Sequence, residues 1–233
     1  MIFALRRRAT IALAIVALTT VAAPAQQDER WKALEAQIDR IYAQSEYSLP
    51  RFGPARWLED GTAYTTVERG AGQAGGSDIV RYDAATGARS ILIANTQLIP
   101  VGSERALPID DYVWSDDGSK LLIFTNTKKV WRQNTRGDYW VLSLLTEASK
   151  GSGSEGGKGG ALKQVGTSHP PSSLMFAKFS PDATRIGYVR GNNVYVERLD
   201  DGRVTQLTND GSETIINGTS DWVYEEEFGL RAR

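Results

Sequence analysis

The sequence contains no cysteine and only one histidine, His169. The absence of cysteine excludes disulfide bridges, thiol nucleophiles and iron–sulfur centres, and a single histidine without cysteine excludes the usual zinc sites. An excess of charge of one sign is also lacking, since 27 basic and 28 acidic residues leave a net charge of −1. Such a balanced chain has no electrostatic field with which to hold DNA or RNA. We therefore expect no metal, no other cofactor and no nucleic acid partner.

Long hydrophobic runs are lacking as well. Three arginines at 6–8 precede an uncharged stretch from Ala9 to Ala23, which is shorter than the roughly 18 residues that span a bilayer. The small residues of Ala23-Pro24-Ala25 suit a signal peptidase. This pattern favours a cleaved secretory signal at 1–25 over a membrane anchor. The mature protein is then expected to be periplasmic or secreted, with no membrane attachment.

The remaining composition, 41% hydrophobic and 24% charged, is that of an ordinary globular protein with a packed core. Residues 28–44 carry apolar side chains at helical spacing with charges between them, which predicts one short amphipathic helix within an N-terminal connector at 26–53. The apolar positions are Trp31, Leu34, Ile38 and Ile41. From Pro54 onward, short alternating runs separated by Asp, Gly, Asn and Ser predict an all-β region at 54–233.

An internal repeat organises this β region. Each copy has an aromatic residue at the end of a strand and then a turn built on Asp-Gly or Pro-Asp. An Asp side chain caps such a turn, and glycine accepts the positive φ that the turn needs. The three copies are 57–61, 114–118 and 179–183. The third has Ala183 in place of glycine, so the sequence leaves the type of that turn open.

Three further strands follow each turn, so the chain is predicted to contain three four-stranded units in tandem. They span 63–69, 78–83 and 90–93 in the first unit, 121–127, 139–145 and 161–165 in the second, and 186–190, 194–199 and 204–208 in the third. Such units are typical of the blades of a β-propeller, and a meandering sandwich is the alternative that the spacing leaves open. Propellers have about four to eight blades, so three make an incomplete β-propeller and the front part of a larger protein.

Two loops lengthen the repeat. Residues 149–160 are almost entirely Gly and Ser with a few Lys and Glu, and 71–76 form a shorter stretch of the same kind. Segments of this composition are flexible and do not pack against a core. We assign no function to either loop.

The segment at 220–228 holds three consecutive carboxylates, Glu225, Glu226 and Glu227, between aromatic residues. Adjacent carboxylates repel one another, and neighbouring aromatic rings reduce their solvation, so the arrangement is costly unless a cation binds there. A bound ammonium group would offset that cost. The alternative is an exposed acidic turn, which a run of Glu by itself favours.

The amino-acid sequence of this segment resembles a known motif. Residues 221–228 resemble the double-glutamate segment of the dipeptidyl peptidase IV family, serine peptidases that remove dipeptides from free N-termini. Upstream, Thr125-Asn126 and Trp131-Arg132 are similar to a strand and a Trp-Arg pair of the same family. The resemblance runs from about Trp57 to Phe228 and includes the recurring turns of an eight-bladed propeller. The helix and the Gly/Ser loop match no family motif.

The resemblance implies roles for particular residues. Glu226 and Glu227 match the pair that holds the α-ammonium group of the substrate, and Arg132 matches the arginine that binds the carbonyl group of the second substrate residue. The partner implied is therefore a peptide with a free N-terminus. Three neighbours are expected to support the segment without touching the ligand: Trp222, Tyr224 and Glu225.

The family also has a C-terminal α/β-hydrolase domain with a catalytic serine in a Gly-x-Ser-x-Gly elbow. This sequence contains no such elbow, and His169 lies in a Pro-rich loop typical of a surface histidine. We therefore expect the propeller part of an exported dipeptidyl peptidase, inactive alone, with a missing hydrolase domain as its partner and a homodimer when complete. The alternative is a noncatalytic periplasmic propeller that binds a partner protein.

Overall fold

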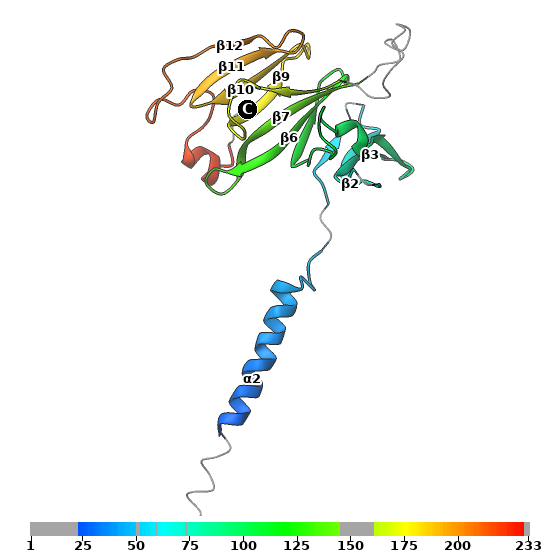
Figure 1. Cartoon of the computed structure of the whole chain (residues 1–233), viewed down its shortest axis with the longest axis vertical. Coiled ribbons are helices and arrows are strands. Elements are labelled where there is room, and N and C mark those ends of the chain that lie inside the picture. Colours follow the sequence, from blue (N-terminus) through cyan, green and yellow to red (C-terminus); the bar gives the residue numbers. More distant parts are fainter. Residues whose placement is uncertain (1–22, 50–51, 59, 73, 145–160, 231–233) are drawn as a thin grey trace, which may run out of the picture. The chain divides into compact units, whose positions relative to one another are not determined.

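The structure, a computed structural model, describes residues 23–49, 52–58, 60–72, 74–144 and 161–230. The chain divides into two compact units, Met1–Arg51 and Phe52–Arg233 (Figure 1). Nearly all of the expected signal peptide and the whole Gly/Ser loop at 149–160 lie outside the described residues. No helix in the described part of the chain has the length and apolar character needed to cross a membrane.

The first unit contains the helix that the sequence predicts. Helix α2 spans Ala23–Ile38 and continues into the π-helical turn η1, Asp39–Ala43. The four apolar side chains that gave the prediction remain between 43% and 57% exposed. The periodicity therefore identifies the helix correctly, although its apolar stripe stays open to solvent.

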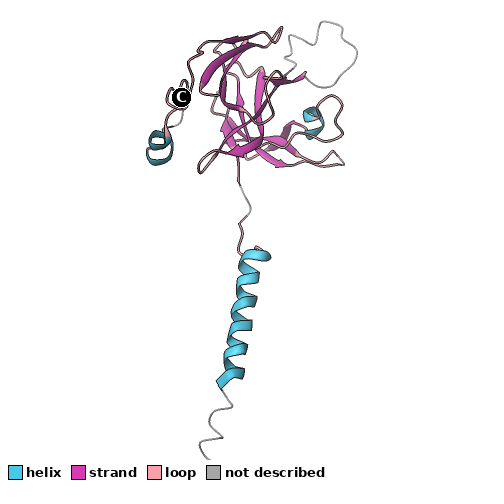
Figure 2. Ribbon diagram, turned by 60° about the vertical axis from the view of Figure 1, so that its left-hand side comes forward, coloured by secondary structure: helices cyan, strands magenta, loops and turns pink. Residues whose placement is uncertain are grey.

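The second unit is built of strands, with short helical segments at η2 and η4 (Figure 2). Strands β1 to β4 form a four-stranded antiparallel sheet in sequence order, and the other strands form an eight-stranded sheet. The bounds are β1 Ala55–Trp57, β2 Ala63–Arg69, β3 Ser77–Asp83, β4 Arg89–Ile93, η2 Asn95–Leu98, β5 Asp111–Trp114, β6 Lys120–Lys129, β7 Asn134–Ser143, β8 Leu162–Val165, β9 Leu174–Phe179, β10 Arg185–Arg190, β11 Asn193–Arg198, β12 Val204–Gln206 and η4 Val223–Glu227. Three meanders in sequence order, β1–β4, β5–β8 and β9–β12, confirm the expected open set of propeller blades. We call them blades 1, 2 and 3.

The hairpin of β6 and β7 differs from the prediction. Both strands are ten residues long and extend beyond the edge of their blade, because β6 continues to Lys129 and β7 begins at Asn134. One end of β7 pairs with β8, and its other end pairs with β9 through Arg136↔Met175 and Gly137↔Leu174. Blades 2 and 3 are consequently joined into one sheet, which the repeat alone does not predict.

The repeated turns have one geometry in all three blades. Gly61, Gly118 and Ala183 adopt φ values of 65°, 65° and 52°, and the N–H of each donates to the carbonyl oxygen three residues earlier. Ala183 thus occupies the left-handed conformation that the sequence left uncertain, and its side chain is fully buried. The acidic side chain before each of these residues accepts hydrogen bonds from within its turn. Asp117 accepts from the Ser115 hydroxyl at 2.6 Å and from the Ser119 N–H at 3.0 Å.

These turns predict acid sensitivity. Hydrogen bonds from Ser115 and Ser119 lower the pKa of Asp117 to about 2, and those from Ser180 and Thr184 lower the pKa of Asp182 to about 2. A carboxyl whose pKa is lower in the folded state stabilises the fold above its ordinary pKa near 3.8, and this contribution is lost as the pH falls towards 2. The Asp117→Asn/Asp182→Asn variant is therefore expected to lose less stability than the wild type between pH 5 and pH 2.5, measured by urea unfolding.

The control for this experiment is Asp116→Asn. Asp116 is exposed and accepts no hydrogen bond from the residues that the structure describes. Its variant should follow the wild-type pH dependence. The same loss of stability in the double variant and the wild type would show that the turn carboxylates do not determine the acid response.

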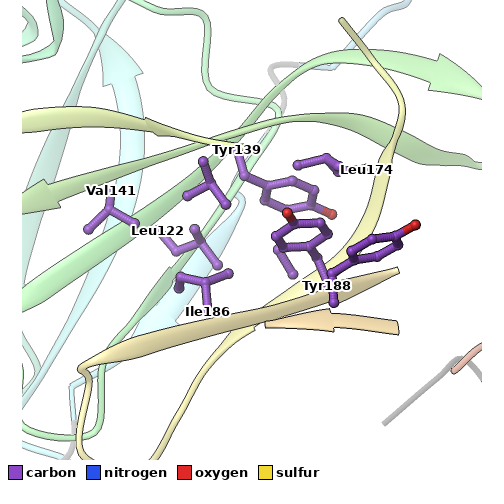
Figure 3. Close-up of a cluster of buried hydrophobic side chains, with 9 residues drawn as sticks. Leu122, Tyr139, Val141, Leu174, Ile186 and Tyr188 are labelled. Atoms are coloured by element: carbon purple, nitrogen blue, oxygen red, sulfur yellow. The ribbon is translucent and has the colours of Figure 1, made fainter. Parts of the chain in front are cut away.

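The core explains why blade 2 is central to the unit. Leu122 points into a cluster with residues of blade 3, whereas Leu121 and Ile123 point into a second cluster with residues of blade 1. Successive side chains of a strand face opposite sides of the sheet, so both faces of blade 2 are buried. Figure 3 shows the cluster shared with blade 3, where Tyr139 and Leu174 lie close to Tyr188, and Leu122 lies beside Ile186. This packing holds β6 and β7 firmly up to the point where their hairpin leaves the sheet.

Candidate recognition site

The acidic segment folds into the helical turn η4, Val223–Glu227. Asp221 begins the turn by accepting a hydrogen bond from the Tyr224 N–H at 3.0 Å, and the Phe228 N–H donates to the Val223 carbonyl at 3.3 Å. In a helical turn, successive side chains point in different directions around the axis. The three glutamates differ in exposure: Glu225 is 3% exposed and the Glu226 side chain 2%, whereas the Glu227 side chain is 51% exposed.

The Trp-Arg pair lies at the tip of the β6–β7 hairpin. The Val130 N–H donates to the Gln133 carbonyl at 2.9 Å, which closes a tight turn around Trp131 and Arg132. Trp131 has a positive φ of 24°. The Arg132 side chain is 66% exposed, so most of its surface faces solvent.

The hairpin tip and η4 lie side by side (Figure 1), although 94 residues separate Arg132 from Glu226 in sequence. The Arg132 backbone N–H donates to Glu226 Oε1 at 3.0 Å, and its Nε lies 3.3 Å from Glu226 Oε2. Arg132 Nη2 lies 3.9 Å from Glu227 Oε1. The structure thus brings together the three residues that the resemblance implies for substrate binding.

The two carboxylates of the site are not equivalent. Both oxygens of Glu226 are engaged by Arg132, and its side chain is almost inaccessible. Glu227 is half exposed and makes a longer contact with the guanidinium group. Two carboxylates and one guanidinium group leave one net negative charge, which lies mainly on the accessible Glu227. The cluster can therefore attract a small cation at Glu227 and still offer guanidinium N–H groups to an acceptor.

The neighbouring residues frame the turn. The Glu225 N–H donates to the Asp221 carbonyl at 3.1 Å, and the Glu225 side chain is buried. Trp222 and Tyr224 are 43% and 52% exposed, and the Tyr224 ring lies 5.8 Å from the ring of Phe228. The two aromatic side chains keep much of their surface available beside the carboxylates.

The environment of His169 differs from the one that the sequence predicts. His169 is partly buried rather than a plain surface residue, because its ring packs edge-on against Tyr188 and Tyr195 at centroid distances of 5.9 and 5.3 Å. Burial, together with the nearby charge of Arg190, holds the pKa of His169 below its ordinary value. The ring packs in blade 3, and its Nε2 lies 3.2 Å from the Tyr188 hydroxyl.

Asp138 is a residue that sequence reasoning missed. It lies on β7 at the base of the hairpin, and its two oxygens accept hydrogen bonds from Asn126 Nδ2 and from the Ser172 N–H, both at 2.6 Å. Neither residue spacing nor composition marks these three positions as partners.

Within the described residues, no group of three or more His, Cys, Asp or Glu side chains is arranged to hold a metal ion.

Comparison with known proteins identifies the relatives of this chain. It is 29% identical over 189 residues to dipeptidyl-aminopeptidase B of Aspergillus niger, which covers 77% of this chain and 19% of the relative. It is 30% identical over 189 residues to a probable dipeptidyl-aminopeptidase B of Aspergillus fumigatus, with 76% and 19% covered. The chain therefore spans about a fifth of the length of these curated relatives.

A solved structure and a family model agree with these relatives. The crystal structure of Porphyromonas gingivalis dipeptidyl peptidase 4 superposes with a TM-score of 0.57 at 27% identity, over 78% of this chain and 23% of that one. The family model described as "Dipeptidyl peptidase IV (DPP IV) N-terminal region" matches residues 115–232, which include Arg132, Glu226 and Glu227. The chain therefore belongs to the family of dipeptidyl peptidase IV N-terminal regions, with the β-propeller fold of that region.

Proposed function

We propose that this chain is the substrate-recognition part of an exported serine-type dipeptidyl peptidase, and that Arg132, Glu226 and Glu227 bind the free N-terminus of a peptide. The observation that carries the proposal is the convergence of these three side chains from two segments 94 residues apart. Membership of the dipeptidyl peptidase IV family and the names of the curated relatives support it.

The chemistry of the cluster suits this ligand. An α-amino group has a pKa near 7.7 to 8.0, so it is largely cationic at neutral pH. Glu227 offers it an accessible carboxylate, and Glu226 fixes the arginine beside that carboxylate. The exposed guanidinium of Arg132 has N–H groups left to donate to a peptide carbonyl oxygen. A blocked N-terminus or an internal peptide nitrogen is an uncharged amide and gains little from this cluster, so the site would select free N-termini of peptides.

Hydrolysis itself needs groups that this sequence does not contain. The serine of a Gly-x-Ser-x-Gly elbow and its base would come from an α/β-hydrolase domain. We propose that such a domain is the partner of this propeller and that the complete enzyme forms a homodimer. By itself the chain would bind a dipeptide without cleaving it.

The experiment that tests the proposal is an NMR titration of the 233-residue chain with Gly-Pro and with N-acetyl-Gly-Pro. Gly-Pro is expected to shift the Arg132 Nε–H resonance and the amides of η4, and to bind roughly tenfold more tightly than the blocked dipeptide, because one charged hydrogen-bonding group is lost on acetylation. Equal affinity for the two ligands would contradict recognition of the ammonium group. It would favour a propeller that binds a partner protein instead.

A further inference from the structure

We infer that Asp138 is a positioning residue, which sets the direction in which the β6–β7 hairpin leaves the sheet and thereby places Arg132 against Glu226 and Glu227. The functional meaning of this inference rests on the proposed function of that cluster. The inference itself concerns the geometry of the unliganded chain and can be tested without a ligand.

The hairpin bends where Asp138 lies. The regular pairing of β6 with β7 ends at Thr125↔Asp138 and resumes at Lys128↔Arg136, so β6 carries one extra residue at this point. Asn126 occupies the break with a φ of 48°, in the left-handed region. An extra residue of this kind is a β-bulge, which bends a strand and increases its twist. A second register shift lies nearer the tip, between Lys128↔Arg136 and Lys129↔Asn134. The bulge at Asn126 therefore sets the direction in which the hairpin leaves the sheet.

Three hydrogen bonds close a ring across the bulge. Asp138 Oδ2 accepts from Asn126 Nδ2, Asp138 Oδ1 accepts from the Ser172 N–H, and the Ser172 hydroxyl donates to the Asn126 carbonyl, each at 2.6 Å. Ser172 is 3% exposed and has a φ of 54°. The ring thus connects β6, β7 and the segment that enters β9. Asp138 is its centre because both of its oxygens take part.

The backbone around the bulge is closely packed, so the strands can bend there in only one way. Gly137 lies directly before Asp138, and a Cβ atom at that position would come within 2.5 Å of Phe124 Cε2 and 2.7 Å of the Thr125 carbonyl oxygen. At the same place β7 changes its partner strand from β8 to β9. Without the carboxylate of Asp138, packing still holds the strands together, but the side-chain link that orients the outer part of the hairpin is lost.

The distance to the tip amplifies small changes at the base. β7 extends from Asp138 back to Asn134, which is about 13 Å along an extended strand, and Arg132 lies in the turn beyond it, so a tilt of roughly 9° moves the tip by about 2 Å. The contacts of Arg132 with Glu226 have lengths of 3.0 and 3.3 Å. A displacement of that size breaks both of them. The orientation of the hairpin base therefore controls whether the recognition cluster assembles.

The test compares Asp138→Ala with Asp138→Asn in the 233-residue chain without ligand. The readout is the NMR resonance of the Arg132 Nε–H, which is assigned by its loss in Arg132→Lys. The position of this resonance in the Glu226→Gln variant is the reference for a broken contact. Asp138→Ala is expected to move this resonance towards that position and to weaken Gly-Pro binding roughly tenfold. Asp138→Asn should keep both the resonance position and the affinity of the wild type. Its amide oxygen can accept from the Ser172 N–H, and its amide nitrogen can donate to Asn126 Oδ1 once the Asn126 side-chain amide flips by 180°.

The control variant is Asp116→Ala, which removes an exposed carboxylate from another turn and should leave the resonance unchanged. If Asp138→Ala does not fold, Asn126→Gly replaces it, because glycine tolerates the positive φ and loses only the side-chain link. An unchanged Arg132 resonance in folded Asp138→Ala or Asn126→Gly would overturn the inference. A shifted resonance supports the inference even if the wild-type chain binds no dipeptide, a result that would refute only the proposed function.

Discussion

Glu227→Gln and Glu226→Gln are each expected to weaken the binding of Gly-Pro to this chain by roughly tenfold to a hundredfold, because a hydrogen bond to a charged group contributes about 1.5 to 3 kcal/mol. The two variants act for different reasons. Glu227 is half exposed and would bind the ammonium group itself. Glu226 is almost inaccessible and holds both the backbone and the side chain of Arg132, so its replacement also releases the arginine. Isothermal calorimetry or NMR titration at neutral pH measures the effect.

The matched control is Glu213→Gln, an exposed carboxylate outside the cluster, which should leave the affinity within about twofold of the wild type. Binding of N-acetyl-Gly-Pro should change little in Glu227→Gln and Glu213→Gln, because no ammonium group is present, whereas Glu226→Gln also releases Arg132 and should weaken the blocked dipeptide too. Unchanged Gly-Pro affinity in both Glu226→Gln and Glu227→Gln would mean that these carboxylates do not recognise the N-terminus. The acidic segment would then be a solvated turn.

The largest effect on stability is expected from Ile186→Ala on β10. Ile186 is fully buried in the cluster that blades 2 and 3 share (Figure 3), so a truncated side chain leaves a cavity lined by apolar groups. Loss of apolar burial together with the new cavity should lower the free energy of unfolding by about 2 to 5 kcal/mol. Urea unfolding followed by tryptophan fluorescence measures this change.

Ile91→Ala is the control for that measurement, since it makes the same chemical change on a strand at a side chain that is 52% exposed. Its cost should stay below about 1 kcal/mol. Equal destabilisation by the two variants would mean that the interface between blades 2 and 3 is not a packed core.

The parts of the fold that the sequence predicts are those with local causes. Strand β2 and the three repeated turns depend on alternation and on side chains two or three residues apart, and both are found where they were expected. Ala183 is the position at which the local sequence pattern was ambiguous. The sequence left its turn type open, yet the hydrogen bonds of Ser180 and Thr184 to Asp182 produce the same turn that glycine allows elsewhere.

The parts that the sequence does not predict depend on contacts between distant segments. The change of partner of β7 follows from its pairing with β9 at Arg136 and Gly137, and the local sequence does not mark the full length of the β6–β7 hairpin. His169 is partly buried because two tyrosines from β10 and β11 contact its ring, and a Pro-rich loop gives no sign of those contacts. For the candidate site, the resemblance named Arg132, Glu226 and Glu227. The different exposure of the two glutamates and the hydrogen bonds of Asp138 could be seen only in the structure.

The joining of blades 2 and 3 has a consequence for cooperativity. Blade 1 is a separate sheet, so its strands share no backbone ladder with blade 2 in the part of the chain that the structure describes, and side chains such as Arg56 and Asp111 connect the two. Regions joined by side chains alone can open as separate cooperative units, whereas a continuous ladder opens as one. Arg132 and η4 belong to the part beyond blade 1. We therefore expect a local opening of blade 1 to leave the arginine–glutamate cluster assembled.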